Sequence, residues 1–313
     1  MLQSIHTLPL SEIVTSQLKA NGFCYVEDIR QSTELPISSS DKIQEVQILS
    51  NVPRCISALD ILQEELQRDK ISTLSYELDN ILGGGFQCGT ITELCGAPGS
   101  GKTQICLQLC ITVQMSRIRK GLGAEALYMD TRNGVLGARL REMAMGCQAY
   151  FEDEVFDVKK ILERITVASP QSFDEIVAVL DNFEYLIKNR QVRLVVLDSL
   201  SFLRHSLESA FNCTQICFQI LDTLYKLSTK HNLVVVITNE LITKFNGERD
   251  TDLYPAGGTF CAHRIHTRLM LTCLNNNQFS SEAIKASMVP QISKKFQVTT
   301  EGVRDIIMEK IGT

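Results

Sequence analysis

The sequence lacks several features that are typical of membrane, secreted or zinc-binding proteins. No apolar stretch approaches the length of a membrane span, and the longest apolar runs, such as Leu233–Ile237, are strand-sized. The N-terminus has no basic region followed by an apolar one, so we expect no secretion signal. None of the 11 cysteines forms a C-x-x-C pair, and no histidine cluster completes a zinc set. We therefore expect no membrane partner, and cysteines that pack inside an intracellular protein.

An excess of positive charge is also missing. The chain has 31 Lys and Arg against 36 Asp and Glu, which gives a formal net charge of −5. This balance argues against broad, non-specific binding of nucleic acid by the whole surface, although a local basic loop or a basic partner chain remains open. The 313 residues, of which 44% are hydrophobic, are enough for one large α/β domain and a small one.

Residues 1–50 are predicted to form a small helical domain, residues 51–70 a linker, and residues 71–313 the main domain. Ile13, Val14 and Leu18 form a helical stripe, and the following Asn-Gly pair is a typical helix end. A second short helix is expected at 26–29, a third after 38–41, and a charged helix at 58–68. Since the first unit is too small for a large core, it is interpreted as an adaptor.

The pattern after about residue 71 alternates between strands and helices. Apolar runs without alternation, as at 194–197, are typical of central strands of a parallel sheet that is covered on both faces. Shorter pieces after residue 265 are expected to form a meander that extends the sheet edge. The predicted strands are 90–95, 126–130, 165–168, 193–198, 233–238, 268–274, 283–289 and 295–299.

The segment at 96–103, Gly-Ala-Pro-Gly-Ser-Gly-Lys-Thr, fits the phosphate-loop pattern G-x-x-x-x-G-K-[ST] without substitution. Glycines let backbone N–H groups approach phosphates where a Cβ would crowd the anion. Lys102 supplies a cation, and the Thr103 hydroxyl is suited to Mg²⁺. A strand-like run precedes the loop and a helical pattern follows it, so the helix N-terminus points at the phosphates. The predicted nucleotide-binding residues are Gly96, Ala97, Pro98, Gly99, Ser100, Gly101, Lys102 and Thr103.

A second part of the nucleotide site is an apolar run at 193–198 that ends in Asp198. This position lies at the carboxyl edge of the predicted sheet, where α/β folds bind ligands. Acidic residues are common at strand ends, so Asp198 indicates a metal ligand only in combination with the phosphate loop. Together the two motifs predict Mg²⁺ held by Thr103 and Asp198.

Several segments resemble the RecA-type eukaryotic strand-exchange recombinases, over roughly residues 71–305. The resembling segments are Leu-Asp-Asn-Ile-Leu-Gly-Gly-Gly at 78–85, Gly-Thr-Ile-Thr-Glu at 89–93, the phosphate loop with the following Gln104, and 128–131, 192–198 and 237–239. Finer matches at 95–99, 202–205, 296–298 and 302–305 look like the C-type paralogue of that family. Residues 18–23 and 26–28 are similar to its small helical domain.

The resemblance implies a RecA-like P-loop core with a mostly parallel sheet, and ATP with Mg²⁺ bound between neighbouring subunits. It implies that Gln104 belongs to the nucleotide site and that Arg139 stacks on adenine, the alternative being a solvated helix arginine. It also implies homologous-recombination repair and meiotic recombination in the nucleus, with the cytoplasm as a further location, although no Lys/Arg cluster marks an import signal.

The resemblance further implies contacts with single-stranded or branched DNA from two loops, near 200–212 and 241–264, with solvated surface as the alternative. The linker at 51–70 has no Phe-x-x-Ala, the motif by which the recombinase polymerises with itself. We therefore expect other recombinase paralogues as partners, the main recombinase as a further candidate, and weak DNA binding by the chain alone. The loop residues concerned are Arg204, His205, Lys244, Arg249, His263 and Arg264.

Two positions depart from the family pattern. Where the family has Asp-Thr-Glu-Gly, with the Glu orienting the attacking water, this chain has Asp-Thr-Arg-Asn at 130–133. An arginine cannot accept a proton from water, because its guanidinium stays protonated. Where the family has a Gln that senses the γ-phosphate, this chain has Glu240.

We consider three explanations for these departures. Arg132 and Glu240 form an ion pair; or the site has drifted and Arg132 points into solvent; or Glu240 has become the water-positioning carboxylate. Each predicts slow hydrolysis, and the candidate catalytic residues are Lys102 and Glu240.

Three functions follow. The first is a DNA-stimulated ATPase, and the second is a scaffold in which ATP only stabilises subunit contacts. The third, a P-loop small-molecule kinase, is not supported by the glycine-rich segment at 83–89.

Overall fold

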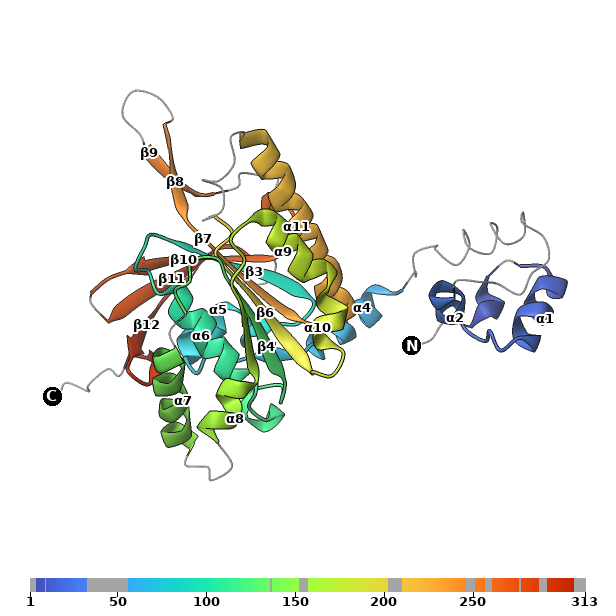
Figure 1. The fold of residues 1–313 in the computed structure, drawn as a ribbon, viewed down its shortest axis with the longest axis horizontal. Coiled ribbons are helices and arrows are strands. Elements are labelled where there is room, and N and C mark those ends of the chain that lie inside the picture. Colours follow the sequence, from blue (N-terminus) through green and yellow to red (C-terminus); the bar gives the residue numbers. More distant parts are fainter. Residues whose placement is uncertain are drawn as a thin grey trace. The chain divides into compact units, whose positions relative to one another are not determined.

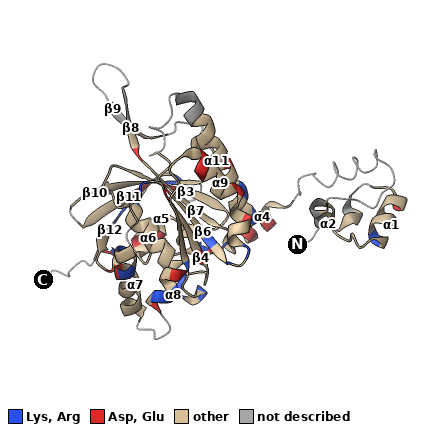
Figure 2. Cartoon of the chain, in the orientation of Figure 1, with Lys and Arg blue, Asp and Glu red and all other residues tan. Residues whose placement is uncertain are grey.

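The computed structural model describes residues 4–8, 10–32, 56–135, 137–151, 157–201, 210–245, 251–256, 261–275, 277–286 and 292–306. The chain divides into two compact units, Met1–Gln67 and Arg68–Thr313. The helix predicted after residues 38–41 lies outside the described residues. Figure 2 shows acidic and basic positions interspersed along the described elements.

The first unit is helical, as the sequence predicts. Ile5, Val14, Leu18 and Ile29 are all buried and form its core. Helix α1 ends before Gly22, whose φ of +87° is a conformation that favours glycine. Its elements are η1 (Ile5–Thr7), α1 (Glu12–Ala20), α2 (Val26–Gln31) and α4 (Ala58–Leu66).

The second unit is an α/β domain with a nine-stranded sheet (Figure 1). Its helices are α5 (Tyr76–Ile81), α6 (Lys102–Thr112), η2 (Arg117–Arg119), α7 (Gly137–Phe151), α8 (Val158–Glu163), α9 (Phe173–Asp181), α10 (Phe183–Ile187) and α11 (Ala210–Lys230). Its strands are β1 (Lys70–Ile71), β2 (Phe86–Gln87), β3 (Thr90–Gly96), β4 (Glu125–Asp130), β5 (Ile165–Ala168), β6 (Val192–Asp198), β7 (Val234–Asn239), β8 (Leu241–Phe245), β9 (Thr251–Pro255), β10 (Thr267–Cys273), β11 (Gln278–Lys285), β12 (Ser293–Thr299) and β13 (Gly302–Asp305).

The strand order is β13-β12-β11-β10-β3-β7-β6-β4-β5. The pairs from β10 to β5 are parallel, and β10, β11, β12 and β13 form an antiparallel meander. Both features confirm the prediction. Strand β11 begins five residues before the predicted 283, because its run is not continuously apolar: Phe279, Ser281 and Ala283 alternate into the interior.

Helices cover both faces of the parallel strands, as the unbroken apolar runs indicate (Figure 1). In β6, Leu194 and Val196 pack in one core with α6, α7 and α8. The intervening Val195 and Leu197 pack in a second core with α9 and α11. Strand β6 therefore contributes alternate side chains to two cores.

Parallel pairing brings the carboxyl ends of β3, β7, β6 and β4 to one edge of the sheet. Cys95 of β3 is in register with Asn239 of β7, and Asp130 of β4 is in register with Asp198 of β6. Loops that leave these strands must meet there, which positions the site described below. Among the described residues, no helix has the length and apolarity needed to cross a membrane.

Candidate functional site

The loop between β3 and α6 depends on its glycines. Gly99 has a φ of +79°, and Gly101, the N-cap of α6, has a φ of +89°. A Cβ on Gly96 would lie 2.3 Å from Ser100 Oγ and 2.5 Å from the carbonyl oxygen of Leu271. The glycine pattern is therefore required by the backbone, and the loop delivers the N-terminus of an 11-residue helix to the sheet edge.

Lys102 folds back over this loop. Its ammonium donates to the carbonyl oxygens of Gly96 and Ala97 at 2.7 and 2.9 Å, and to Ser100 Oγ at 3.3 Å. Burial lowers the pKa of Lys102, and the nearby Glu240 carboxylate opposes that shift. The structure thus places a buried cation where the sequence predicts contact with phosphate.

Asp198 joins three strands and α6 through its carboxylate. Thr103 Oγ1 donates to Oδ2 at 2.7 Å, as does the Tyr128 hydroxyl at 2.7 Å. Thr238 Oγ1 donates to Oδ1. The Thr103 hydroxyl and the Asp198 carboxylate are hard oxygen ligands at one point, so this donor set fits Mg²⁺.

Sequence reasoning missed Tyr128 and Thr238. Both lie near the carboxyl ends of β4 and β7, the strands on either side of β6. Burial raises the pKa of Tyr128, so its hydroxyl remains a donor at neutral pH. The sequence did contain a signal for these two residues. Each is a polar residue within an apolar strand, and each strand is a neighbour of the strand that carries Asp198.

Arg132 and Glu240 form an ion pair between a guanidinium NH₂ group and Oε1 of the carboxylate. The backbone N–H of Arg132 also donates to Asp130 Oδ1 at 3.0 Å. The structure confirms the predicted pairing, and it does not show an Arg132 side chain directed into solvent. It brings together the two positions at which the sequence departs from the family pattern.

Arg139 and Gln104 are also brought together, because Arg139 Nε donates to Gln104 Oε1 at 2.8 Å. The same guanidinium donates to the carbonyl oxygens of Thr299, which ends β12, and of Thr300 in the turn that follows. The Arg139 side chain is 17% exposed, so it is not a solvated helix arginine. Its stacking on adenine stays a prediction.

A buried ion pair that the sequence analysis did not single out supports the end of β7. Glu93 of β3 is fully buried and pairs with Arg268 of β10. Asn239 Nδ2 donates to Glu93 Oε1 at 2.7 Å and to the carbonyl oxygen of Ala256 at 2.6 Å. Asn239 directly precedes Glu240, so the buried pair helps to hold the backbone that carries it.

The predicted DNA-contact residues are only partly described. Arg204, His205 and Arg249, and the side chain of Lys244, lie outside the described part of the structure. Strands β8 and β9 pair antiparallel in the second loop. Arg264 forms an ion pair with Asp222 of α11 and lies 5.4 Å from the ring centre of Phe218, whereas His263 is exposed. DNA contact therefore stays a prediction.

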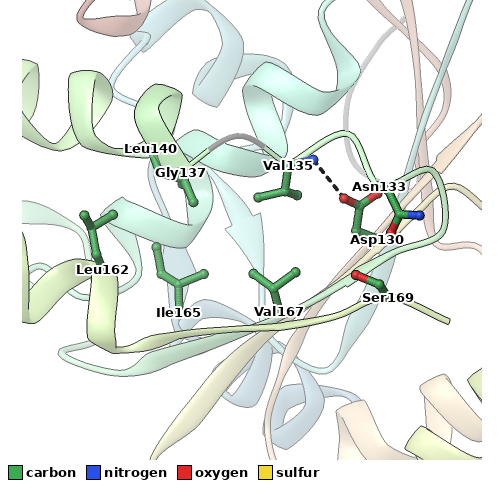
Figure 3. Close-up of a pocket in the computed structure, with 9 residues that line it drawn as sticks. All are labelled: Asp130, Asn133, Val135, Gly137, Leu140, Leu162, Ile165, Val167 and Ser169. Carbon is green, nitrogen blue, oxygen red and sulfur yellow. Dashed lines mark hydrogen bonds between the residues drawn. The ribbon is translucent and has the colours of Figure 1, made fainter.

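A cavity of about 400 Å³ opens at the β5 end of the same edge (Figure 3). Aliphatic side chains from α7, α8 and β5 line it, and the Asp130 carboxylate accepts a hydrogen bond from the Val135 N–H at 2.8 Å. Its lining residues are Asp130, Asn133, Val135, Gly137, Leu140, Leu162, Ile165, Val167 and Ser169. The sequence analysis did not predict it.

Comparisons with known proteins agree with this geometry. The Rad51 family model matches residues 66–306. The chain is 29% identical over 345 residues to DNA repair protein RAD51 homolog 3 of Cricetulus griseus, an alignment covering 97% of this chain and 93% of that protein. It is 29% identical over 300 residues to DNA repair and recombination protein RadA of Aeropyrum pernix, covering 95% of this chain and 92% of that protein. Because the family model spans most of the sequence and includes the phosphate loop and Asp198, the chain belongs to the Rad51 family.

Proposed function

We propose that this chain binds Mg·ATP and acts in homologous-recombination repair of DNA and in meiotic recombination. The observation that carries the proposal is the phosphate loop, with buried Lys102 folded over it and the Thr103–Asp198 oxygen pair beside it, in a Rad51-family chain. The relatives described above are DNA repair and recombination proteins by name, which supports this assignment.

Each part of the site has a role in this proposal. The backbone N–H groups of 96–101 and the N-terminus of α6 hold the phosphates, and Lys102 offsets their charge. Thr103 and Asp198 hold Mg²⁺, which would supply further positive charge beside the phosphates. Arg139 stacks on adenine, and Gln104, which accepts a hydrogen bond from Arg139, also belongs to the nucleotide site. Glu240 is the candidate for orienting water.

The proposed partners are other Rad51-family chains, with the main recombinase as a further candidate, together with single-stranded or branched DNA in the nucleus. The absence of Phe-x-x-Ala from residues 51–70 supports assembly with relatives over polymerisation of the chain with itself.

A second candidate function is a scaffold that binds ATP without hydrolysing it. It is favoured by Arg132, which stands where the family has its water-orienting Glu and is engaged with Glu240. The family match over 66–306 supports both candidates and gives no support to a small-molecule kinase.

The test is to measure Mg·ATP binding and turnover by the purified chain, with and without single-stranded DNA. Lys102→Ala is expected to lower ATP affinity about 100-fold, since it removes a charged hydrogen-bond donor to phosphate. Lys159→Ala is the matched control, because Lys159 is an exposed lysine on α8.

Binding without turnover, lost in Lys102→Ala, supports the scaffold. DNA-stimulated turnover supports the ATPase, with Glu240 as its catalytic carboxylate. Absence of ATP binding by the unmodified chain overturns the proposal.

A further inference from the structure

The Arg132–Glu240 ion pair belongs to a closed ring of hydrogen bonds. Arg132 Nε donates to Ser199 Oγ at 3.3 Å, and the hydroxyls of Ser199 and Ser201 lie 3.3 Å apart. The backbone N–H of Glu240 donates to Ser201 Oγ at 3.2 Å, which closes the ring. The ring joins the segments that follow β4, β6 and β7.

This ring lies at the same sheet edge as the phosphate loop. It lies at the carboxyl ends of β4, β6 and β7, and β7 is the direct neighbour of β3, which leads into the loop. The Glu240 and Asp198 carboxylates raise the pKa of the Lys102 ammonium, whereas the Arg132 guanidinium lowers it. Both members of the pair therefore act electrostatically on the cation that the proposed site offers to phosphate.

A terminal phosphate would compete with Glu240 for Arg132. Arginine binds phosphate and carboxylate through the same pair of N–H groups, and two anions of like charge repel each other when they share a site. A diphosphate lacks the group that would compete. The effect of the ion pair should therefore differ between a triphosphate and a diphosphate.

We propose that Arg132 is a specificity-determining residue that distinguishes ATP from ADP, by exchanging the Glu240 carboxylate for the terminal phosphate. This inference rests on the proposed ATP site. Glu240 directly precedes β8, and its carbonyl oxygen accepts the N–H of Ala256, which follows β9, at 2.9 Å. Release of the Glu240 carboxylate therefore acts directly on the base of the β8–β9 hairpin.

The test compares the affinities of a non-hydrolysable ATP analogue and of ADP, each with Mg²⁺, by calorimetry. Arg132→Ala is expected to lower the ratio of ATP-analogue to ADP affinity about tenfold, because the lost contact is a charged hydrogen bond at a partly exposed site. Glu240→Gln is close in shape but removes the competing charge, so it should raise the same ratio about threefold. In the double variant the gain from Glu240→Gln should shrink, since the two side chains interact.

Arg164→Ala is the matched control. The Arg164 side chain is 38% exposed, against 37% for Arg132, and it pairs with Glu125 at the opposite end of β4. It should leave the affinity ratio unchanged. If Arg132→Ala does not fold, Arg132→Lys, which keeps the charge, and Glu240→Gln still test the proposal.

A second measurement does not depend on affinity. Amide hydrogen exchange of 241–245 and 251–256 should change with the ATP analogue but not with ADP, and the difference should vanish in Arg132→Ala. The inference would be overturned if Arg132→Ala lost ATP-analogue affinity and ADP affinity equally. It would also be overturned if Arg132→Ala lost no more affinity than Arg164→Ala. Either result would leave the proposed function intact. Failure of the unmodified chain to bind either nucleotide would instead overturn the proposed function.

Discussion

Two regions at the same sheet edge differ in how they keep to the family pattern. The phosphate loop, with Thr103 and Asp198, matches it at each position that defines the motif. The ends of β4 and β7 depart from it at Arg132 and Glu240. The loop is constrained by its backbone, with φ of +79° at Gly99 and close packing around Gly96, whereas the pair consists of partly exposed side chains.

In the proposed site, the loop contacts to the phosphates and the groups that would orient water therefore lie on separate segments of the chain. Substitution within the loop would disturb the backbone and the helix N-terminus together. Substitution at Arg132 and Glu240 changes the charges next to the proposed position of the terminal phosphate and leaves that backbone in place. Phosphate binding by the loop can therefore persist while the groups that would orient water change.

The largest expected effect concerns the buried ion pair that supports the end of β7. Arg268→Ala should lower the free energy of unfolding by about 3 to 5 kcal/mol, because it leaves the fully buried Glu93 carboxylate without its cation. Urea unfolding measures the change. Lys230→Ala, which breaks the exposed pair with Glu184, should change it by less than about 1 kcal/mol. Equal losses in the two variants would contradict the structural role of the buried pair.

A smaller effect is expected at the proposed Mg²⁺ site. Mg²⁺ is expected to increase the affinity for ATP, and Asp198→Asn should make that increase about tenfold smaller. The reason is that an amide is neutral and offers one carbonyl oxygen. Titration of ATP with Mg²⁺ and with a chelator measures the gain. Asp181→Asn, at an exposed carboxylate, serves as the control. A Mg²⁺ gain that survives in Asp198→Asn would remove Asp198 from the metal site.

The smallest effect tests the groups that orient Asp198. Among the described residues, Tyr128, Thr103 and Thr238 donate hydrogen bonds to Asp198, and Tyr128→Phe removes one of them. The variant should lower the free energy of unfolding by about 1 kcal/mol. The increase in ATP affinity that Mg²⁺ provides should stay within about threefold of its value in the unmodified chain. Tyr76→Phe, at an exposed tyrosine, should leave stability unchanged. A large loss of the Mg²⁺ gain in Tyr128→Phe would mean that the tyrosine belongs to the metal site itself.

Much of the fold was predictable because its signals are local. Unbroken apolar runs predict strands covered on both faces, and β3, β4, β5, β6 and β7 lie within one or two residues of the predicted ranges. Strand β11 was displaced because Ser281 occupies an inward position that a hydrophobic pattern does not mark. The loop residues of the site were predictable for a similar reason, since their pattern is contiguous in the chain.

By itself, the sequence determined the phosphate loop, the Mg²⁺ candidates and the presence of opposite charges at Arg132 and Glu240, because residue types and short spacings encode these. Only the tertiary structure decided which distant groups meet: Tyr128 and Thr238 on Asp198, Glu93 with Arg268, and the serine ring that joins Arg132 to Glu240. Those contacts depend on strand order and register, which bring together residues between 39 and 175 positions apart in the chain. Pairing between strands that are distant in sequence leaves no mark in any single segment.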